Sequence, residues 1–196
     1  MQAMQILLDE HQSLAAIIHG IRHMIRDIGA GKLQPDFKLL KAMVHYLDAY
    51  PEKKHHPKED VYLFEPLRAR TDKANAALDR LAAEHATSDE RIASLSAALD
   101  QYVIGQAKSF ESFRQAFEDY ANFYREHMLL EEREVLPLVR QYFTADDWAR
   151  ADAGFKASRQ SDGAKDGGED FTRMFSKLVE AAPAPIGLGL GPYKDS

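Results

Sequence analysis

The sequence predicts an all-α protein, an up-down-up-down four-helix bundle with extra helices at its C-terminus. Three observations support this fold class. Apolar residues recur at steps of three and four through four long segments, which is the spacing of one helix face. Glycine or proline falls between several of these segments, where helices end and begin. The two halves of the bundle also carry the same polar residues at matching positions, as two packed helical hairpins would.

Composition bounds the organisation of the chain. With 196 residues, 45% of them hydrophobic, it can form one good core, and we expect a bundle over residues 1–143 and a helical appendage with a flexible tail over 144–196. The 31 acidic residues against 25 basic ones argue against a nucleic-acid partner. The absence of cysteine excludes disulfides, thiolate metal sites and thiol catalysis.

No part of the sequence predicts a membrane partner. No segment approaches the roughly 18 consecutive apolar residues of a membrane span. Asp9 and Glu10 interrupt the first short apolar run, so we expect no secretory leader. The expected location is therefore the cytoplasm.

Residues 4–29 form the first predicted helix, which Gly29 and Gly31 end. His11 lies inside its apolar stripe, whereas His19 and His23 lie at the edge and are expected to be partly exposed. The stripe consists of Leu7, His11, Leu14, Ile18, Ile21, Ile25 and Ile28.

Pro35 opens the second helix, whose apolar face leaves His45 at the surface. Pro51 and Pro57 predict a kink or break farther on. If the helix direction is kept, His55 and Glu59 continue the inner face, one turn apart. His56 then points about 100° away, and we expect it beside the ligands or at the surface.

The third and fourth predicted helices cover residues 72–104 and 110–139, with Gly105 between them. His85 occupies a position in the apolar seam of the third helix. On the fourth helix an aromatic stripe continues into polar residues, which are costly to bury alone. This stripe consists of Phe110, Phe113, Phe117, Tyr120, Tyr124, His127, Glu131 and Glu134.

The C-terminal segment contains weaker signals. Thr144 and Asp147 are spaced as a helix cap, which predicts a short helix to about Phe155. Residues 158–168 have the composition of a flexible linker, and an amphipathic helix with Phe171 and Leu178 on its apolar side follows. The final residues carry no core pattern and are either disordered or packed against the bundle.

The two halves of the bundle repeat one arrangement of polar residues. His11 precedes the pair His55 and Glu59, as His85 precedes the pair His127 and Glu131. The offsets between halves are 74, 72 and 72 residues (85 − 11, 127 − 55 and 131 − 59). Burying four imidazoles and two carboxylates at one level without an ion would be unfavourable, so the pattern predicts a metal site.

The pattern H…H-x-x-x-E…H…H-x-x-x-E on four helices resembles the hemerythrin-like HHE cation-binding proteins, over about residues 4–142. The resemblance implies two iron ions inside the bundle, a non-haem di-iron centre that is oxo- or hydroxo-bridged and also bridged by carboxylates. The ligands that it implies are His11, His55, Glu59, His85, His127 and Glu131. Ferritin-like bundles are the nearest alternative, but they need two E-x-x-H pairs, and only Glu52 and His55 fit that spacing.

Two positions differ from the oxygen-carrying members of that family. Asp89 stands where they have a second histidine on the third helix, and the last pair is His and Glu four apart instead of His and Asp five apart. Four histidines, two bridging carboxylates and one bridging oxygen fill about ten of about twelve places on two six-coordinate irons. Two places stay open unless a further ligand fills one; the candidates are Asp89, Glu10, Tyr120 and Tyr124.

A centre with two open places favours chemistry over reversible oxygen storage. The leading prediction is reaction with a small oxidant (hydrogen peroxide above all, O2 or NO) of a catalase- or peroxidase-like kind. Relatives of the four-histidine type include peroxide-decomposing proteins and iron or oxygen sensors. A module that senses iron or oxygen without turnover is therefore the alternative, and enzyme and sensor both remain open at this point. A third interpretation is a bundle with Zn or no functional metal. No protein partner is indicated.

Overall fold

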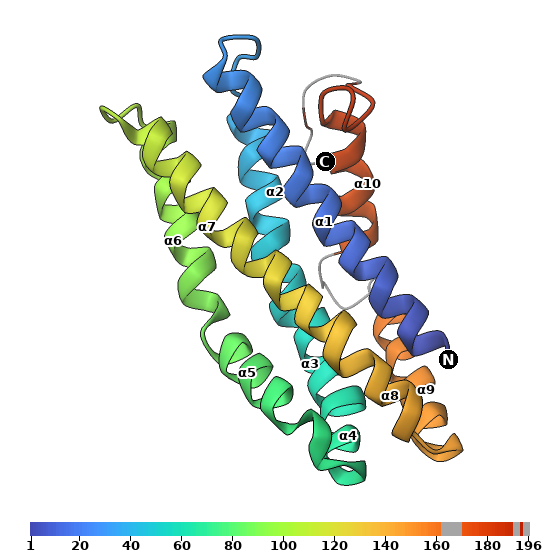
Figure 1. Cartoon of the computed structure of the whole chain (residues 1–196). Coiled ribbons are helices and arrows are strands. Elements are labelled where there is room, and N and C mark those ends of the chain that lie inside the picture. The colour runs from blue at the N-terminus through green and yellow to red at the C-terminus, as the bar shows by residue number, and fades with distance from the viewer. Residues whose placement is uncertain (162–169, 190–192, 194–196) are drawn as a thin grey trace.

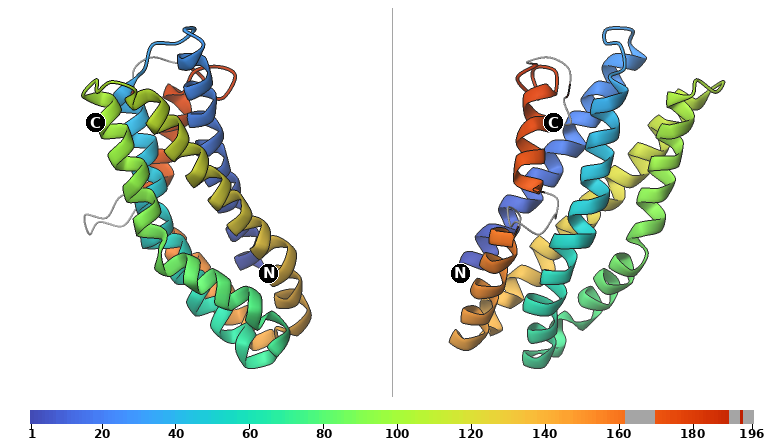
Figure 2. Two further views of the ribbon diagram at one scale, coloured as in Figure 1. Left: turned by 60° about the vertical axis from the view of Figure 1, so that its left-hand side comes forward. Right: turned by 180° about the vertical axis from the view of Figure 1, so that it is seen from behind.

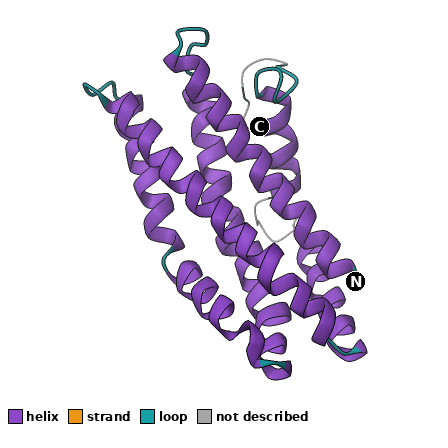
Figure 3. Cartoon of the chain, viewed as in Figure 1, coloured by secondary structure: helices purple, strands orange, loops and turns teal. Residues whose placement is uncertain are grey.

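The computed structural model describes residues 1–161, 170–189 and 193. All regular structure in these residues is helical (Figure 3). Four long helical rods alternate in direction, as predicted, and two further helices pack beside them (Figures 1 and 2). The rods are α1 (Gln2–Gly29), α2 to α4 (Phe37–Tyr50, His56–Glu59 and Glu65–Arg70), α5 with α6 (Asn75–Ala86 and Ser88–Val103), and α7 with α8 (Ser109–Leu130 and Leu136–Tyr142). Among the described residues no helix is long and apolar enough to cross a membrane.

The second rod keeps its direction through the prolines, where a kink or break was predicted (Figure 1). Its α-helical pieces are joined by the π-helical segments Pro51–His55 and Asp60–Phe64. In the first segment the backbone N–H of His56 donates to the carbonyl of Pro51, five residues back. Proline has no backbone N–H to continue the α-helical hydrogen bonds, and the wider turn accommodates this loss. Such turns occur frequently at functional sites.

The third rod is interrupted, although one continuous helix over 72–104 was predicted. It begins with a 3₁₀ turn at Asp72–Ala74, and Thr87 separates α5 from α6 with a non-helical backbone (φ −118°, ψ 7°). The Thr87 hydroxyl donates to the carbonyl of Ala83 at 3.1 Å, so the side chain competes with the backbone for helical acceptors. The fourth rod contains a third π-helical segment, Glu131–Val135.

Two apolar cores fill the bundle, one on each side of a polar layer. The first core lies between α1, α2, α6, α7 and α10 (Phe171–Ala181), and includes Leu14, Leu47, Leu95 and Phe117. The second core lies between α1, α4, α5, α8 and α9 (Ala145–Ser161), and includes Leu7, Leu67, Leu81, Val139 and Phe155. Along α1, Leu7 belongs to the second core and Leu14 to the first, and His11 lies between them. The polar layer is therefore enclosed by apolar packing at both ends.

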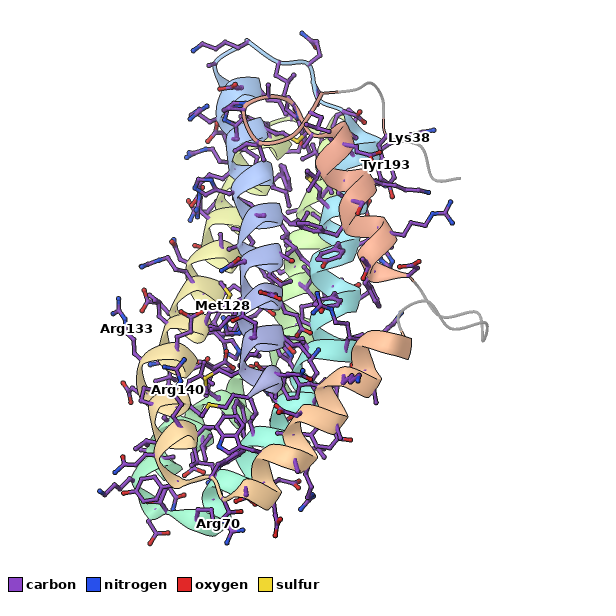
Figure 4. All side chains as sticks on the ribbon, turned by 90° about the vertical axis from the view of Figure 1, so that its right-hand side faces the viewer. Lys38, Arg70, Met128, Arg133, Arg140 and Tyr193 are labelled. Atoms are coloured by element: carbon purple, nitrogen blue, oxygen red, sulfur yellow. The ribbon has the colours of Figure 1, made fainter. Side chains whose placement is uncertain are left out.

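The C-terminal helices cover one side of the bundle. Helix α9 (Ala145–Ser161) is longer than predicted and includes residues 158–161 of the predicted linker, whereas residues 162–169 lie outside the described part. Helix α10 (Phe171–Ala181) packs Phe171 against Tyr46 and Tyr50 of α2. The described part of the tail lies against the bundle, and Tyr193 belongs to the first core (Figure 4). The division of the chain between residues 143 and 144 stays a prediction.

The predicted cap holds the start of α9. The backbone N–H of Thr144 donates to Asp147 Oδ2 at 2.9 Å, and the N–H of Asp147 donates to Thr144 Oγ1 at 3.2 Å. Arg70, at the end of α4, donates to both carboxylate oxygens of Asp147, at 2.8 and 3.1 Å. The same side chain thus caps α9 and fastens it to the second rod, at the end of the molecule where Figure 4 labels Arg70.

Asp147→Asn should lower the melting temperature by a few degrees, because it removes the charge that Arg70 binds. The hydrogen bonds from Arg70 lower the pKa of Asp147 by more than burial raises it, so its folded pKa lies below the ordinary value. This contribution is fully present above about pH 4 and is lost as the pH falls through the folded pKa. Thermal melting of the two proteins should therefore differ at pH 7 and converge in acid.

The control is Asp146→Asn, which changes the exposed neighbouring carboxylate in the same helical turn. Equal melting temperatures for the two variants at pH 7 would contradict the assignment of Asp147 as the fastening residue.

Candidate metal centre

The structure brings the six predicted side chains together in the polar layer between the two cores. His11, His55, Glu59, His127 and Glu131 are each at most 3% exposed, and the His85 side chain is 8% exposed. Their donor atoms fall into two groups, within each of which the atoms lie within 4.8 Å of one another. We name as group A His11 and His55 with Glu59 and Glu131, and as group B His56, His85 and His127.

The two carboxylates lie between the groups. Glu59 Oε1 is 3.3 Å from His55 Nε2, and its Oε2 is 3.8 Å from His85 Nε2. Glu131 Oε2 is 3.1 Å from His11 Nε2, and its Oε1 is 3.3 Å from His127 Nε2. Each carboxylate thus directs one oxygen to a histidine of group A and the other to a histidine of group B. This is the arrangement of two carboxylates that can bridge two metal ions.

His56 corrects the expectation from helical spacing. It is buried, and its ring stacks on that of His85 with centroids 4.0 Å apart. The assumption of an α-helix turned His56 away from His55, but His56 follows directly on the π-helical segment Pro51–His55. In this wider turn both adjacent histidines face the polar layer. A fifth histidine therefore lies where the sequence pattern predicted four.

The other candidate ligands lie outside both groups. Asp89 is exposed in the first turn of α6. Glu134, predicted on the buried stripe, is also exposed, because the π-helical segment Glu131–Val135 shifts the inner face. The Tyr120 hydroxyl donates to the carbonyl of Leu47 at 3.2 Å, and the Tyr124 hydroxyl lies 3.4 Å from His56 Nε2.

A ring of carboxylates orients four of the histidines. Each carboxylate accepts from the Nδ1 atom on the outer side of an imidazole, which leaves Nε2 directed inward. The pairs are His11 with Glu132 (2.8 Å), His55 with Glu10 (2.9 Å), His85 with Asp60 (3.2 Å) and His127 with Glu84 (2.8 Å). Glu10 was considered as a ligand from the sequence, but it occupies this outer position.

The sequence analysis did not identify the roles of Glu84, Asp60 and Glu132. Each is adjacent in sequence to a predicted ligand: Glu84 precedes His85, Asp60 follows Glu59, and Glu132 follows Glu131. Each serves a histidine on a different rod. An acidic residue directly beside a ligand position was therefore the available signal.

The carboxylates set the pKa values of the histidines. Burial lowers the pKa of His127, but Glu131 and Glu84 raise it by more, to about 10. Burial also lowers the pKa of His11, and Glu131 and Glu132 raise it well above the ordinary value. Burial raises the pKa of Glu131, whereas His127 and His11 lower it well below its usual range. In this layer ionised carboxylates therefore lie against imidazoles, and their negative charge favours a positive charge on the imidazoles.

Two basic side chains extend this network outward. Lys58 Nζ donates to Glu10 at 2.5 Å, so a chain runs from Lys58 through Glu10 to His55. Lys58 is buried and lies over the rings of Tyr50 and Phe155. In the other half of the bundle, Arg80 donates to Glu84 at 2.7 Å, and Glu84 accepts from His127. Unlike Lys58, Arg80 is 55% exposed.

The donor set fits a metal cation. Among the described residues, Nε2 of His11, Nε2 of His55 and both carboxylate oxygens of Glu59 and Glu131 are buried without a hydrogen-bond partner. Leaving such groups unsatisfied is costly in an apolar interior. Nitrogen and oxygen donors from imidazole and carboxylate suit iron, zinc or manganese. Cations bound in this layer would satisfy these atoms.

Fold and site together define a metal-binding four-helix bundle. The family model described as the hemerythrin HHE cation binding domain matches residues 2–139. The chain therefore belongs to the hemerythrin HHE cation-binding family, and its domain binds metal cations. No curated protein and no solved structure gave a significant match. Helices α9 and α10 lie beyond the matched residues.

His56→Ala should remove one donor of group B and lower the metal content of the purified protein, because this group then offers two imidazoles instead of three. Elemental analysis of the purified variant measures this. His45→Ala is the matched control, since His45 is exposed on the same rod. An unchanged metal content in His56→Ala would show that His56 is not a ligand, as helical spacing predicted.

Lys58→Met should lower both the melting temperature and the metal content, because it leaves the Glu10 carboxylate buried beside His55 without its ammonium partner. Lys58→Arg should restore much of both. Arg80→Met removes the corresponding cation of the other half, but from an exposed position, and should change little. Similar losses in Lys58→Met and Arg80→Met would show that burial of the lysine has no special role.

Proposed function

We propose that this protein holds a non-haem di-iron centre that reduces hydrogen peroxide. The observation that carries the proposal is the position of Glu59 and Glu131, each with one oxygen toward group A and one toward group B. A single ion would not use donors on both sides of two carboxylates. Imidazole and carboxylate donors without thiolates suit non-haem iron.

The histidine count limits the exchangeable places. With one oxygen from each carboxylate, group A offers four donors and group B five. If each iron takes about six ligands and one solvent-derived bridge is shared, one place stays open, beside His11 and His55. The sequence alone left two open places, and that count favoured chemistry over reversible oxygen storage. With His56 as a ligand the centre has a single position for a small oxidant, so the argument for chemistry depends on the residues around it instead. That position lies in the more deeply buried group.

The surrounding residues favour redox chemistry at this position. Two iron ions bound here would supply electrons for reduction of the O–O bond, by cycling between iron(II) and iron(III). Glu59 and Glu131 would hold the two ions at a fixed separation. The carboxylates on the Nδ1 atoms make the imidazoles stronger donors, which favours the higher oxidation state over reversible oxygen storage. The two apolar cores limit the access of water to the layer.

A sensing function is the second candidate, and one observation favours it. Phe155 of α9 lies over the buried Lys58, and Phe171 of α10 lies against Tyr50, so helices outside the matched domain contact the wall of group A. A change at the metals could alter how these helices pack. Metal-dependent ordering of α9 and α10 without peroxide turnover would favour this function.

Protein produced with adequate iron should contain about two Fe per chain, show near-ultraviolet absorption when oxidised, and consume hydrogen peroxide over many turnovers. Glu131→Gln should lose iron and turnover together, because a neutral amide bridges two metals poorly. Glu134→Gln changes an exposed carboxylate three residues on and should retain both.

Elemental analysis, an absorption spectrum and a peroxide electrode give these three measurements. A protein that takes up one zinc ion or no metal would refute the di-iron centre. A di-iron protein that binds O2 reversibly and leaves peroxide unchanged would keep the centre but refute the reaction.

A further inference from the structure

A cavity of about 520 Å³ adjoins group B on the side away from α1. It lies between α3–α4 and α5, and both His56 and His85 border it. Its apolar wall includes Phe64 and Leu78. The cavity therefore joins the surface of the bundle to two candidate ligands of one metal.

Small side chains on α5 leave this space open. Ala82 and Ala86 are one helical turn apart and both line the cavity. Across the cavity, Pro57 occupies the first turn of α3. Longer side chains at the two alanine positions would project into the space, so the sequence keeps an opening beside the centre.

The cavity is too large for peroxide alone. A water molecule occupies about 30 Å³ in the liquid, and hydrogen peroxide has only one more oxygen atom. The volume instead falls within the range of about 300–1,000 Å³ found for sites that bind organic molecules. The open metal position also lies beside His11 and His55 of group A, whereas this cavity reaches group B. A molecule bound in this cavity would therefore be a second one, beside the ligands of group B.

Charges around the cavity favour a neutral occupant. Asp60 and Glu65 contribute two carboxylates, and Arg68 contributes the one guanidinium among its lining residues. Arg68 already binds Asp79 at 2.7 Å, so its charge is partly neutralised. The residues that line the cavity thus offer no unpaired arginine or lysine to bind an anion.

The wall nearest the centre is aromatic. The His85 ring is nearly parallel to those of both His56 and Phe64, with interplanar angles of 16° and 17°. Aromatic rings attract one another in offset or edge-to-face contact, typically with centroids about 4.5–7 Å apart. These rings contact one another and all three residues border the cavity, so an aromatic molecule is the kind of occupant that packs beside them. Asp60, which accepts from His85 through Oδ1, has a second oxygen to accept from a hydroxyl group.

We propose that this cavity binds a neutral aromatic reductant of the phenol or hydroquinone class, which makes the protein a peroxidase rather than a catalase. The inference rests on the proposed reduction of peroxide. For hydroquinone, two C–O single bonds become C=O bonds as the molecule gives up two electrons and two protons. Hydrogen peroxide takes both electrons and both protons, its O–O bond breaks, and two water molecules leave.

Titration calorimetry with phenol and the iron-loaded protein, without peroxide, tests binding apart from activity. One phenol should bind per chain with a Kd of about 1 mM. Ala82→Phe should weaken binding about tenfold or more, because the new ring occupies the cavity. Ala83→Phe places the same ring on the adjacent position of α5, which does not line the cavity, and should bind phenol as the unmodified protein does. Ala86→Leu is a second cavity-filling variant should Ala82→Phe fold poorly.

Oxidation of hydroquinone by peroxide gives the second measurement. Cavity-filling variants should keep their iron and lose most of this oxidation, whereas Ala83→Phe keeps both. Absence of phenol binding to an iron-loaded protein that consumes peroxide would overturn this inference and leave the proposed function standing. Equal phenol binding in Ala82→Phe, Ala86→Leu and the unmodified protein would overturn it as well. Loss of the proposed function itself would appear as a chain without iron or without peroxide consumption.

Discussion

The pairing of buried carboxylates with histidine Nε2 atoms is the interaction on which the rest of this bundle depends. Glu59 and Glu131 are fully buried in a layer that has apolar cores on both sides. An isolated carboxylate in such a place would cost several kcal/mol, so the imidazoles or a metal must compensate it. All four rods contribute a histidine to this layer. Each rod therefore has a fixed register, because a shift along the helix would take its histidine away from the carboxylates and leave their charge uncompensated.

Much of the fold could be predicted because the helical spacing of apolar residues shows directly which face of each helix is buried. The four rods, the inward positions of the six polar residues and the cap at Thr144 all follow from spacing. The π-helical segments could not be predicted, because spacing rules assume a uniform turn. This assumption placed His56 outside and Glu134 inside. The helix break at Thr87 was not predicted, for a related reason. A hydroxyl that competes for backbone acceptors leaves the apolar pattern of the sequence unchanged.

The pairing of the outer carboxylates with particular histidines could not be predicted, for a different reason. Glu84 serves His127, 43 residues away, and Glu132 serves His11, 121 residues away. Sequence spacing describes neighbours on one helix, whereas these contacts depend on how two rods are packed. Burial of Lys58 likewise results from the packing of α9 against the second rod, since Phe155 covers the ammonium group. Lys58 lies in sequence between the predicted ligands His55 and Glu59, and without the position of α9 it would be predicted to be a surface charge.

Groups A and B differ in the residues that surround them, and this difference bears on which molecule could reach each group. Group A is enclosed by Lys58, Glu10 and the helices beyond the matched domain, and the proposed open metal place lies beside it. Group B has three histidines, and a cavity reaches two of them, His56 and His85, from outside. A small uncharged oxidant can diffuse into an enclosed site, whereas an organic molecule needs a formed cavity. Under the proposed function, the enclosed side would therefore take the oxidant and the open side its reductant. The bridging carboxylates connect the two sides within one polar layer.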